Sequence, residues 1–220
     1  MSRSLTLLLF CFFFVGFNKP PPRPDVQEVE TFTNQTVGRF PKTFEAYPFQ
    51  KGKAHKVYHV REEGTNRYLE AMDDKNISVQ TMKRFKWDRK VYPIFSWKWR
   101  VKALPKGADE RTPGKNDSAC GVYVVFGSSF GKALKYVWST SAPVGTENPQ
   151  EKNFYLFVKA SGSSRGNQWQ RVTINIANDH QKAFGTPPQY NPIGFAILTD
   201  GNATDSTAAC DYDDFTISKN

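Results

Sequence analysis

Apolar and polar residues alternate along the stretch from Tyr92 to Leu104, which has the sequence YPIFSWKWRVKAL. The apolar side of this alternation carries Phe95, Trp97, Trp99 and Val101, and the polar side carries Ser96, Lys98, Arg100 and Lys102. A period of two is typical of a β-strand that packs one face and exposes the other. Because most aromatic stripes are core residues, we expect the two tryptophans to be buried rather than to form a ligand platform.

Further short runs of apolar, β-branched and aromatic residues are separated by turn residues, as in an all-β protein. They predict strands over residues 56–60, 67–71, 76–80, 120–126, 134–139, 154–158, 169–176, 193–199 and 212–217. The first two runs should form a hairpin around Gly64, which can take a positive φ. The run over 120–126 (CGVYVVF) is apolar on both sides of its alternation, so we expect a strand buried on both faces.

One helical signal interrupts these strands, at residues 178–184. Asn178 or Asp179 can cap its start, Gly185 suits the position after its end, and the two prolines that follow prevent continuation. About ten strands and one short helix predict an all-β fold, an antiparallel β-sandwich of jelly-roll type. We expect this sandwich to occupy residues 26–220 as a single domain, which is an ordinary size for the class.

The chain opens with a segment typical of a signal peptide. Arg3 provides the positive end, and Leu5 to Phe17 form an apolar run shorter than the roughly twenty residues needed to cross a bilayer. No Ala-x-Ala motif follows, so residues 1–18 are either a cleaved signal peptide or a retained N-terminal anchor. Residues 19–25 are rich in proline and form an extended spacer. We therefore expect an exported protein that is periplasmic, envelope-associated or secreted.

The sequence contains three cysteines, and export determines how they pair. Cys11 lies in the leading segment, which leaves Cys120 and Cys210 as an even pair in an oxidising compartment. Cys120 opens one predicted strand, and Cys210 precedes the last one. We expect a disulfide bond between them.

Positive charge is concentrated in residues 51–115, which carry seventeen basic and eight acidic groups, and this predicts a basic face. Its densest part is KRFKWDRK, where Phe85 and Trp87 interleave with Lys83, Arg84, Lys86, Arg89 and Lys90. Basic residues interleaved with aromatic rings are typical of a groove for a polyanion, and a solvated loop is the simpler interpretation. Export makes nucleic acid an unsuitable partner.

Five aspartates lie close together near the C-terminus: Asp200, Asp205, Asp211, Asp213 and Asp214. Oxygen-rich loops hold hard cations such as Ca²⁺, and Asp200, Asp205 and Asp211 are the candidate ligands. The spacing does not match an EF-hand loop, and a turn that uses aspartate for its backbone conformation explains the same residues. Both interpretations stay open at the level of the sequence.

Four longer stretches resemble a known family. They are YPIFSWKWRVKALPKGADERT, NDSACGVYVVF with KALKYVWS, NDHQKAFGTPP and AILTDGNATDSTAACDYDDF. With these stretches the chain resembles the bacterial domain-of-unknown-function family 3047 over residues 40–217. The resemblance implies an exported β-sandwich without an established activity, so no catalytic residue is carried over. The family has no fixed cysteine pair at Cys120 and Cys210, so their disulfide is a feature of this chain.

Three function classes remain, and the first is a non-catalytic binding module for a glycan or another envelope polymer, including an anionic one. Its candidate ligand-binding residues are aromatic, basic or acidic: Trp87, Tyr136, Trp138, Trp169, Lys83, Arg84, Lys86, Arg89, Lys90 and Asp117. The alternatives are a hydrolase or lyase acting on such a polysaccharide, and a structural envelope protein without a ligand site. No convergent acid, base and nucleophile can be named, which favours binding. We expect a monomer that contacts a membrane only through a retained N-terminal segment.

Overall fold

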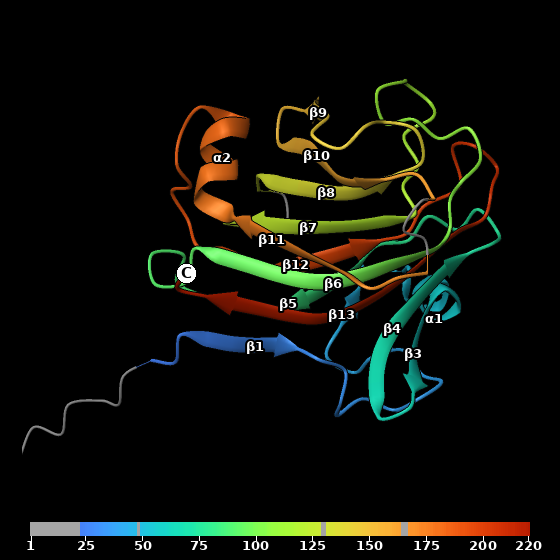
Figure 1. Ribbon diagram of the computed structural model, residues 1–220, viewed down its shortest axis with the longest axis horizontal. Coiled ribbons are helices and arrows are strands. Elements are labelled where there is room, and N and C mark those ends of the chain that lie inside the picture. The colour runs from blue at the N-terminus through green and yellow to red at the C-terminus, as the bar shows by residue number, and fades with distance from the viewer. Residues whose placement is uncertain (1–22, 48, 129–130, 164–166) are drawn as a thin grey trace, which may run out of the picture.

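Two β-sheets pack face to face in the computed structural model, which describes residues 23–47, 49–128, 131–163 and 167–220 (Figure 1). The first sheet has the order β11 (Gln170–Asn175), β6 (Ile94–Ala103), β13 (Ala208–Ser218), β4 (Asn66–Asp73) and β3 (Tyr58–Glu63), and β1 (Val26–Glu30) also pairs with β13. The second sheet has the order β2 (Glu45–Ala46), β5 (Thr81–Arg84), β12 (Pro192–Leu198), β7 (Cys120–Phe126), β8 (Ala133–Ser139), β10 (Phe154–Ser161) and β9 (Glu147–Glu151). The predicted all-β sandwich is therefore confirmed.

The main core lies between the two sheets and is built around β6. Phe95, Trp97 and Trp99 are fully buried there, as the alternation predicts. The Trp97 and Trp99 rings meet edge to face at 5.5 Å between centroids, and Trp99 lies 6.1 Å from Trp138 of the second sheet. Aromatic rings at these separations contribute stability beyond the apolar area that they bury. The central strand is thus a core strand.

The polar side of β6 is less exposed than the alternation predicts, because ion pairs cover it. Arg100 is 7% exposed, and its Nε lies 2.6 Å from Oδ2 of Asp211 on the neighbouring β13. Its Nη1 lies 3.0 Å from Glu63. A charged side chain can be buried when its donors are paired in this way.

The disulfide between Cys120 and Cys210 is confirmed. Cys120 begins β7 in the second sheet, and Cys210 lies on β13 in the first sheet, so the bond links the two layers of the sandwich. Their Cα atoms are 5.4 Å apart, within the usual range for a bridge. Both residues are fully buried in the main core.

The hairpin predicted around Gly64 is confirmed as β3 and β4, and Gly64 has a φ of 63°. The predicted C-terminal helix is α2 (Ile176–Phe184), which follows β11 directly (Figure 1). Asn175, rather than Asn178 or Asp179, caps its start by accepting bonds from two backbone N–H groups. The helix ends as predicted at Gly185, whose φ of 72° is favourable for glycine.

A second helix, α1 (Lys51–Val57), occupies part of a predicted strand, so the expectation of one helix is wrong. Its start at Gln50 has no side-chain cap, and the helix buries Ala54 and Val57 against the sandwich. Tertiary packing therefore stabilises a segment whose start carries no local capping signal. The predicted strand over 56–60 begins only at Tyr58.

The strand predicted over residues 76–80 is also wrong, because the Asp73 carboxylate holds this segment in a turn. Its Oδ1 accepts from the Ile77 N–H at 2.8 Å, and its Oδ2 accepts from the Ser78 N–H at 3.0 Å. Asp side chains favour turns by making such local backbone bonds. A further difference is that β8 and β10 pair in parallel within an otherwise antiparallel sheet.

Candidate functional site

A groove of about 410 Å³ crosses the outer face of the second sheet. Five lining residues lie within strands: Leu198 in β12, Tyr123 in β7, Lys135 in β8, Phe154 in β10 and Gln150 in β9. Two more lie beside the remaining strands, since Gln80 precedes β5 and Tyr47 follows β2. The groove therefore receives residues from five neighbouring strands, β12 to β9, and from the segments that adjoin β5 and β2.

Strand alternation places the floor of this groove on the side away from the main core. Val122 and Val124 of β7 belong to the core between the sheets, and Tyr123 between them points the opposite way. Tyr123 is paired with Lys135 of β8, and paired residues point to the same face of a sheet. Both side chains therefore lie on the outer face, in the centre of the sheet. Rigid strands position these two groups, which favours a preformed binding site.

The groove combines flat apolar rings with groups that donate and accept hydrogen bonds. The rings are those of Tyr47, Tyr123 and Phe154, and the amides are those of Gln50, Gln80, Asn116 and Gln150. An amide side chain can both donate and accept hydrogen bonds, and a sugar hydroxyl can do the same. Ser78, Lys135 and Asp200 complete the polar lining. This chemistry suits a ligand with many hydroxyl groups and some apolar surface.

Lys135 is the charged group on the groove floor and is buried. Burial by itself would lower the pKa of its ammonium group. The Tyr123 hydroxyl and the Asp200 carboxylate outweigh that effect and raise the pKa, so Lys135 keeps its charge. Its Nζ also lies 5.6 Å from the centre of the Tyr123 ring.

Asp200 follows the end of β12 and contributes the negative charge of the groove. Burial raises the pKa of this carboxyl group, and the nearby Asp117 adds to the effect, while Ser78 and Lys135 oppose it. Within the described parts of the chain, Asp200 Oδ1 is buried and has no hydrogen-bond partner. Asp200 was expected to be a metal ligand, and the structure places it in the groove instead.

Three predicted platform rings lie in the core, which corrects that part of the prediction. Trp87, Tyr136 and Trp138 are 5%, 0% and 1% exposed. Trp87 stacks on Phe95 at 5.6 Å, the Tyr136 hydroxyl donates to Asp179, and Trp138 Nε1 donates to the Gly162 carbonyl. A ring that is packed on both faces offers no surface for a sugar.

Trp169 is the predicted platform residue that stays partly exposed, but it lies on the outer face of the first sheet, away from the groove. Its ring covers the Arg100 guanidinium at 4.7 Å and meets Tyr68 edge to face at 5.6 Å. One side of the ring is thus occupied by an internal cation–π contact.

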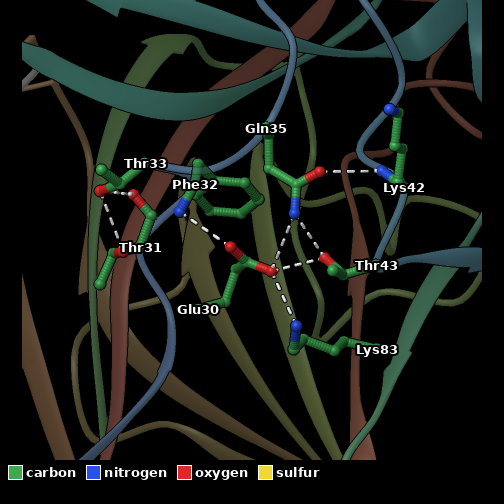
Figure 2. Close-up of polar contacts among 8 residues, drawn as sticks. All are labelled: Glu30, Thr31, Phe32, Thr33, Gln35, Lys42, Thr43 and Lys83. Carbon is green, nitrogen blue, oxygen red and sulfur yellow. Dashed lines mark hydrogen bonds and ion pairs between the residues drawn. The ribbon is translucent and has the colours of Figure 1, made fainter.

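Lys83 is also removed from the set of ligand-binding residues, because it forms a buried ion pair. Figure 2 shows the Glu30 carboxylate among its donors, with Lys83 Nζ at 2.7 Å from Oε2. The Phe32 N–H donates to Oε1 at 2.8 Å, and the Thr43 hydroxyl donates to Oε2 at 2.5 Å. This cluster ties the segment after β1 to β5. Burial alone would raise the pKa of Glu30, but these donors and the charge of Lys83 lower it.

Replacing Lys83 by methionine should lower the free energy of unfolding by about 2 kcal/mol, the usual range for a hydrogen bond to a buried charge. Glu30 keeps its other donors, so the loss is smaller than for a fully orphaned carboxylate. Urea denaturation at pH 7 measures this loss. Lys86→Met is the matched control, since Lys86 is exposed. An equal effect of the two substitutions would contradict the role assigned to Lys83.

The other predicted basic residues do not form one patch. Arg84 pairs with Glu45 at 2.8 Å, and Arg89 donates from Nε to the Pro188 carbonyl at 2.9 Å. Lys86 and Lys90 are exposed. None of the five predicted basic residues lines the groove. The basic segment is mostly engaged in internal contacts, and its first two basic residues, Lys83 and Arg84, lie in β5, so neither a polyanion groove nor a fully solvated loop describes it.

The three candidate metal ligands are not brought together by the structure. Asp211 pairs with Arg100 on the first sheet, Asp205 accepts from Asn76, and Asp200 lines the groove. Within the described residues, no group of three His, Cys, Asp or Glu side chains is arranged to hold a metal ion. Asp117, expected to bind ligand, is fully buried and accepts from the backbone N–H groups of Ala203 and Thr204. These carboxylates support turns and strand faces, as the alternative interpretation states.

Asp213 has a raised pKa and makes stability depend on pH. It accepts from Asn66 at 2.9 Å and from the Asp214 N–H at 2.7 Å, but its burial raises the pKa to about 6 from an ordinary value of 3.8. Between these values the folded state holds a proton that the unfolded state has released. Its contribution is therefore complete below pH 3.8 and is lost as the pH rises through 6.

The substitution Asp213→Asn should remove this part of the pH dependence. The variant should gain stability relative to the wild type as the pH increases from 4 to 7. Urea denaturation of both proteins across that range measures the difference. Asp74→Asn, an exposed position, controls for the change of charge. A difference that does not change with pH would contradict the assignment.

Sequence reasoning missed most of the groove, since it named none of the lining residues except Asp200. A usable signal was present in two strands. Lys135 is the one charged residue in the apolar run ALKYVWS. Tyr123 is the one residue with a polar side-chain group in the middle of the apolar run CGVYVVF. Which strands lie side by side, however, depends on the topology.

Comparisons with solved structures find distant similarities. Solved structures similar to this chain include a family 11 carbohydrate-binding module of a Clostridium thermocellum cellulosomal cellulase, with 8% identity, a TM-score of 0.44, and 87% of this chain and 93% of that chain covered. The xyloglucanase domain of NopAA from Sinorhizobium fredii has 8% identity, a TM-score of 0.46 and coverages of 88% and 97%. The catalytic domain of Humicola grisea Cel12A has 14% identity, a TM-score of 0.43 and coverages of 82% and 95%.

These similarities are distant and do not assign a ligand to this chain. Among curated proteins, no sequence matches the chain. A family model does match residues 42–216, and its description is "Protein of unknown function (DUF3047)".

Proposed function

This chain belongs to the DUF3047 family of proteins of unknown function, and from its groove we propose that it binds a glycan across the second sheet without cleaving it. The observation that carries this proposal is the course of the groove, which receives lining residues from all seven strands or their immediate neighbours. The five strands that contribute lining residues are neighbours in the sheet, and at about 4.8 Å between strands they span roughly 19 Å. A groove of this course accommodates several consecutive sugar rings of a linear polymer.

The lining supports a hydroxyl-rich ligand. Tyr47 and Phe154 are partly exposed and offer ring surface for the apolar faces of sugars, and the amides between them offer paired donors and acceptors. Phe49, close to the Tyr47 end, is a fully exposed phenylalanine with a left-handed φ of 66°. An exposed aromatic ring in a conformation that costs energy is a common feature of binding surfaces. We include it in the proposed binding surface.

Binding without cleavage is favoured by the carboxylates. Glycosidases use a pair of carboxyl groups on either side of the scissile bond. Among the described residues that line the groove, Asp200 is the one carboxylate. The nearby buried Glu110 accepts hydrogen bonds from the hydroxyl groups of Ser118 and Ser139, so it is engaged in the interior. These contacts leave Asp200 without a catalytic partner in the groove.

We further propose that the protein acts outside the cytoplasm on an envelope polymer. The disulfide supports this proposal, because such bonds persist in oxidising compartments. The expected signal peptide over residues 1–18 lies outside the described residues. The helices of the described parts are too short or too polar to cross a membrane.

Replacing Phe154 by alanine should weaken polymer binding about tenfold or more, because an aromatic contact with a ligand is often worth above 1 kcal/mol. Phe154 is only partly buried, so the melting temperature of the variant should be close to that of the wild type. Affinity electrophoresis against a panel of soluble neutral and anionic polysaccharides, followed by titration calorimetry, measures the loss. Tyr190→Ala is the matched control, since Tyr190 is 66% exposed and lies outside this groove.

Three outcomes would contradict the proposal. Absence of binding to every polymer of the panel would remove the groove as a glycan site. Release of reducing sugar ends by the wild-type protein would replace binding with hydrolysis. A Phe154→Ala variant that binds as tightly as the wild type would place the ligand elsewhere on the molecule.

A further inference from the structure

Two groups of opposite charge line the groove and stand apart from each other. Lys135 projects from β8 near the centre of the sheet, and Asp200 lies just after the end of β12. Each affects the pKa of the other, so they are close enough to interact. Yet among the described residues, Lys135 and Asp200 do not form an ion pair within 4.0 Å.

Both residues retain capacity for hydrogen bonding to a ligand. An ammonium group has three donors. Of the side chains that line the groove, Tyr123 lies directly against Lys135, with its ring centre 5.6 Å from Nζ. Asp200 Oδ1 has no hydrogen-bond partner within the described residues. This oxygen is enclosed, but the Asp200 side chain is partly exposed and lines the groove, so a ligand hydroxyl would meet the carboxylate at its exposed part.

We propose that Lys135 and Asp200 determine the specificity of the groove, which selects an uncharged polymer with neighbouring hydroxyl groups over an anionic one. This inference rests on the proposed glycan binding. One ligand hydroxyl donates to the Asp200 carboxylate, and a neighbouring hydroxyl accepts from Lys135 Nζ. The two charges compensate each other, so a neutral ligand leaves the groove electrically balanced.

An anionic polymer meets an unfavourable arrangement in the same place. A uronate or carboxymethyl group attracted to Lys135 would approach the Asp200 carboxylate, which repels it and can offer it no donor when ionised. The amides of Gln80 and Gln150 on either side carry no charge to offset this repulsion. Specificity then arises from one favourable and one repulsive element in the same site.

The test compares matched polymers that differ only in charge: soluble β-glucan with carboxymethyl β-glucan, and dextran with carboxymethyl dextran. The full chain should bind a neutral member more tightly than its carboxymethylated form. Asp200→Asn should weaken the neutral complex by about 10- to 100-fold, the usual cost of losing a hydrogen bond to a charged group. The same variant should bind the carboxymethylated form more tightly than the wild type does. The repulsion by Asp200 is gone, and the positive charge of Lys135 is no longer compensated by a neighbouring carboxylate.

The opposite signs of these two changes distinguish a role in specificity from a structural role, which would weaken both complexes together. Asp205→Asn is the matched control, since it removes the same charge from an exposed position in the same loop. Asp205 has a φ of 50°, a conformation that asparagine also tolerates. This control should leave both affinities unchanged.

A measurement on the wild type keeps the proposal testable if Asp200→Asn does not fold. Binding of the neutral polymer should then be insensitive to salt between 50 mM and 500 mM, since its contacts involve no net charge. Equal or tighter binding of the carboxymethylated polymer would overturn the inference, and so would equal changes of both affinities in Asp200→Asn. If the wild type binds none of the four polymers or the wider panel, the proposed function itself fails. If the protein binds a neutral polymer and Phe154→Ala weakens that binding, the proposed glycan binding stands even where the inference on specificity fails.

Discussion

Replacing Trp138 by alanine should lower the free energy of unfolding by about 3–5 kcal/mol, the usual cost of removing a large aromatic ring from a core. Trp138 is 1% exposed and packs against Trp99 of the opposite sheet at 6.1 Å. Its Nε1 donates to the Gly162 carbonyl at 2.9 Å, so the substitution also removes a hydrogen bond. Urea denaturation monitored by circular dichroism measures the loss.

Trp169→Ala provides the comparison for Trp138, because Trp169 is the partly exposed tryptophan on the outer face of the first sheet. Its loss should be clearly smaller, since one side of the ring faces solvent. Polymer binding by folded Trp138→Ala should match that of the wild type at low temperature. A variant that keeps its stability and loses binding would restore Trp138 as a ligand platform.

Replacing both Cys120 and Cys210 by alanine should lower the free energy of unfolding by about 4 kcal/mol. In the chain-entropy model, a bond that closes a loop of about ninety residues restricts the unfolded chain by that amount. The double substitution is preferred to a single one because it leaves no free thiol in the core. Guanidinium denaturation of the oxidised wild type and of the double variant measures the difference.

Two controls accompany the disulfide prediction. Cys11→Ala should have no effect on the stability of the sandwich, because Cys11 lies in the leading segment. The wild type unfolded and refolded under reducing conditions should have the lower stability of the double variant. Thiol titration of the denatured, unreduced protein should detect no reactive group from Cys120 or Cys210. Equal stabilities of the oxidised wild type and the double variant would show that the bond contributes little.

Local patterns in the sequence were sufficient for the strands that bury one or both faces. The period of two in Tyr92 to Leu104 correctly predicts which side of β6 packs, and the continuous apolar run CGVYVVF correctly predicts a strand buried along its whole length. The Gly64 hairpin and the Gly185 helix end are likewise confirmed, because each depends on a single residue that favours a positive φ. The cysteine pair follows from the count and the compartment.

Local patterns failed where side-chain contacts decide the conformation of a segment. The turn after β4 depends on the Asp73 carboxylate, whose bonds to Ile77 and Ser78 prevent the predicted strand. Helix α1 depends on burial of Ala54 and Val57 against the sandwich, since no capping side chain marks its start. In both segments a side-chain contact outweighs the β propensity of the residues.

The sequence by itself determined the sheet class, the central core strand and the pairing of the two cysteines, because each of these depends on periodicity, on composition or on a count. Only the tertiary structure decided which aromatic rings are free and which carboxylates meet. Trp87, Tyr136 and Trp138 were indistinguishable by type from ligand platforms until the packing of two sheets buried them. The groove is likewise a product of strand order. Asp200 is far in the chain from Tyr123 and Lys135, and it comes near them because β12, which it follows, lies beside β7 and β8 in one sheet.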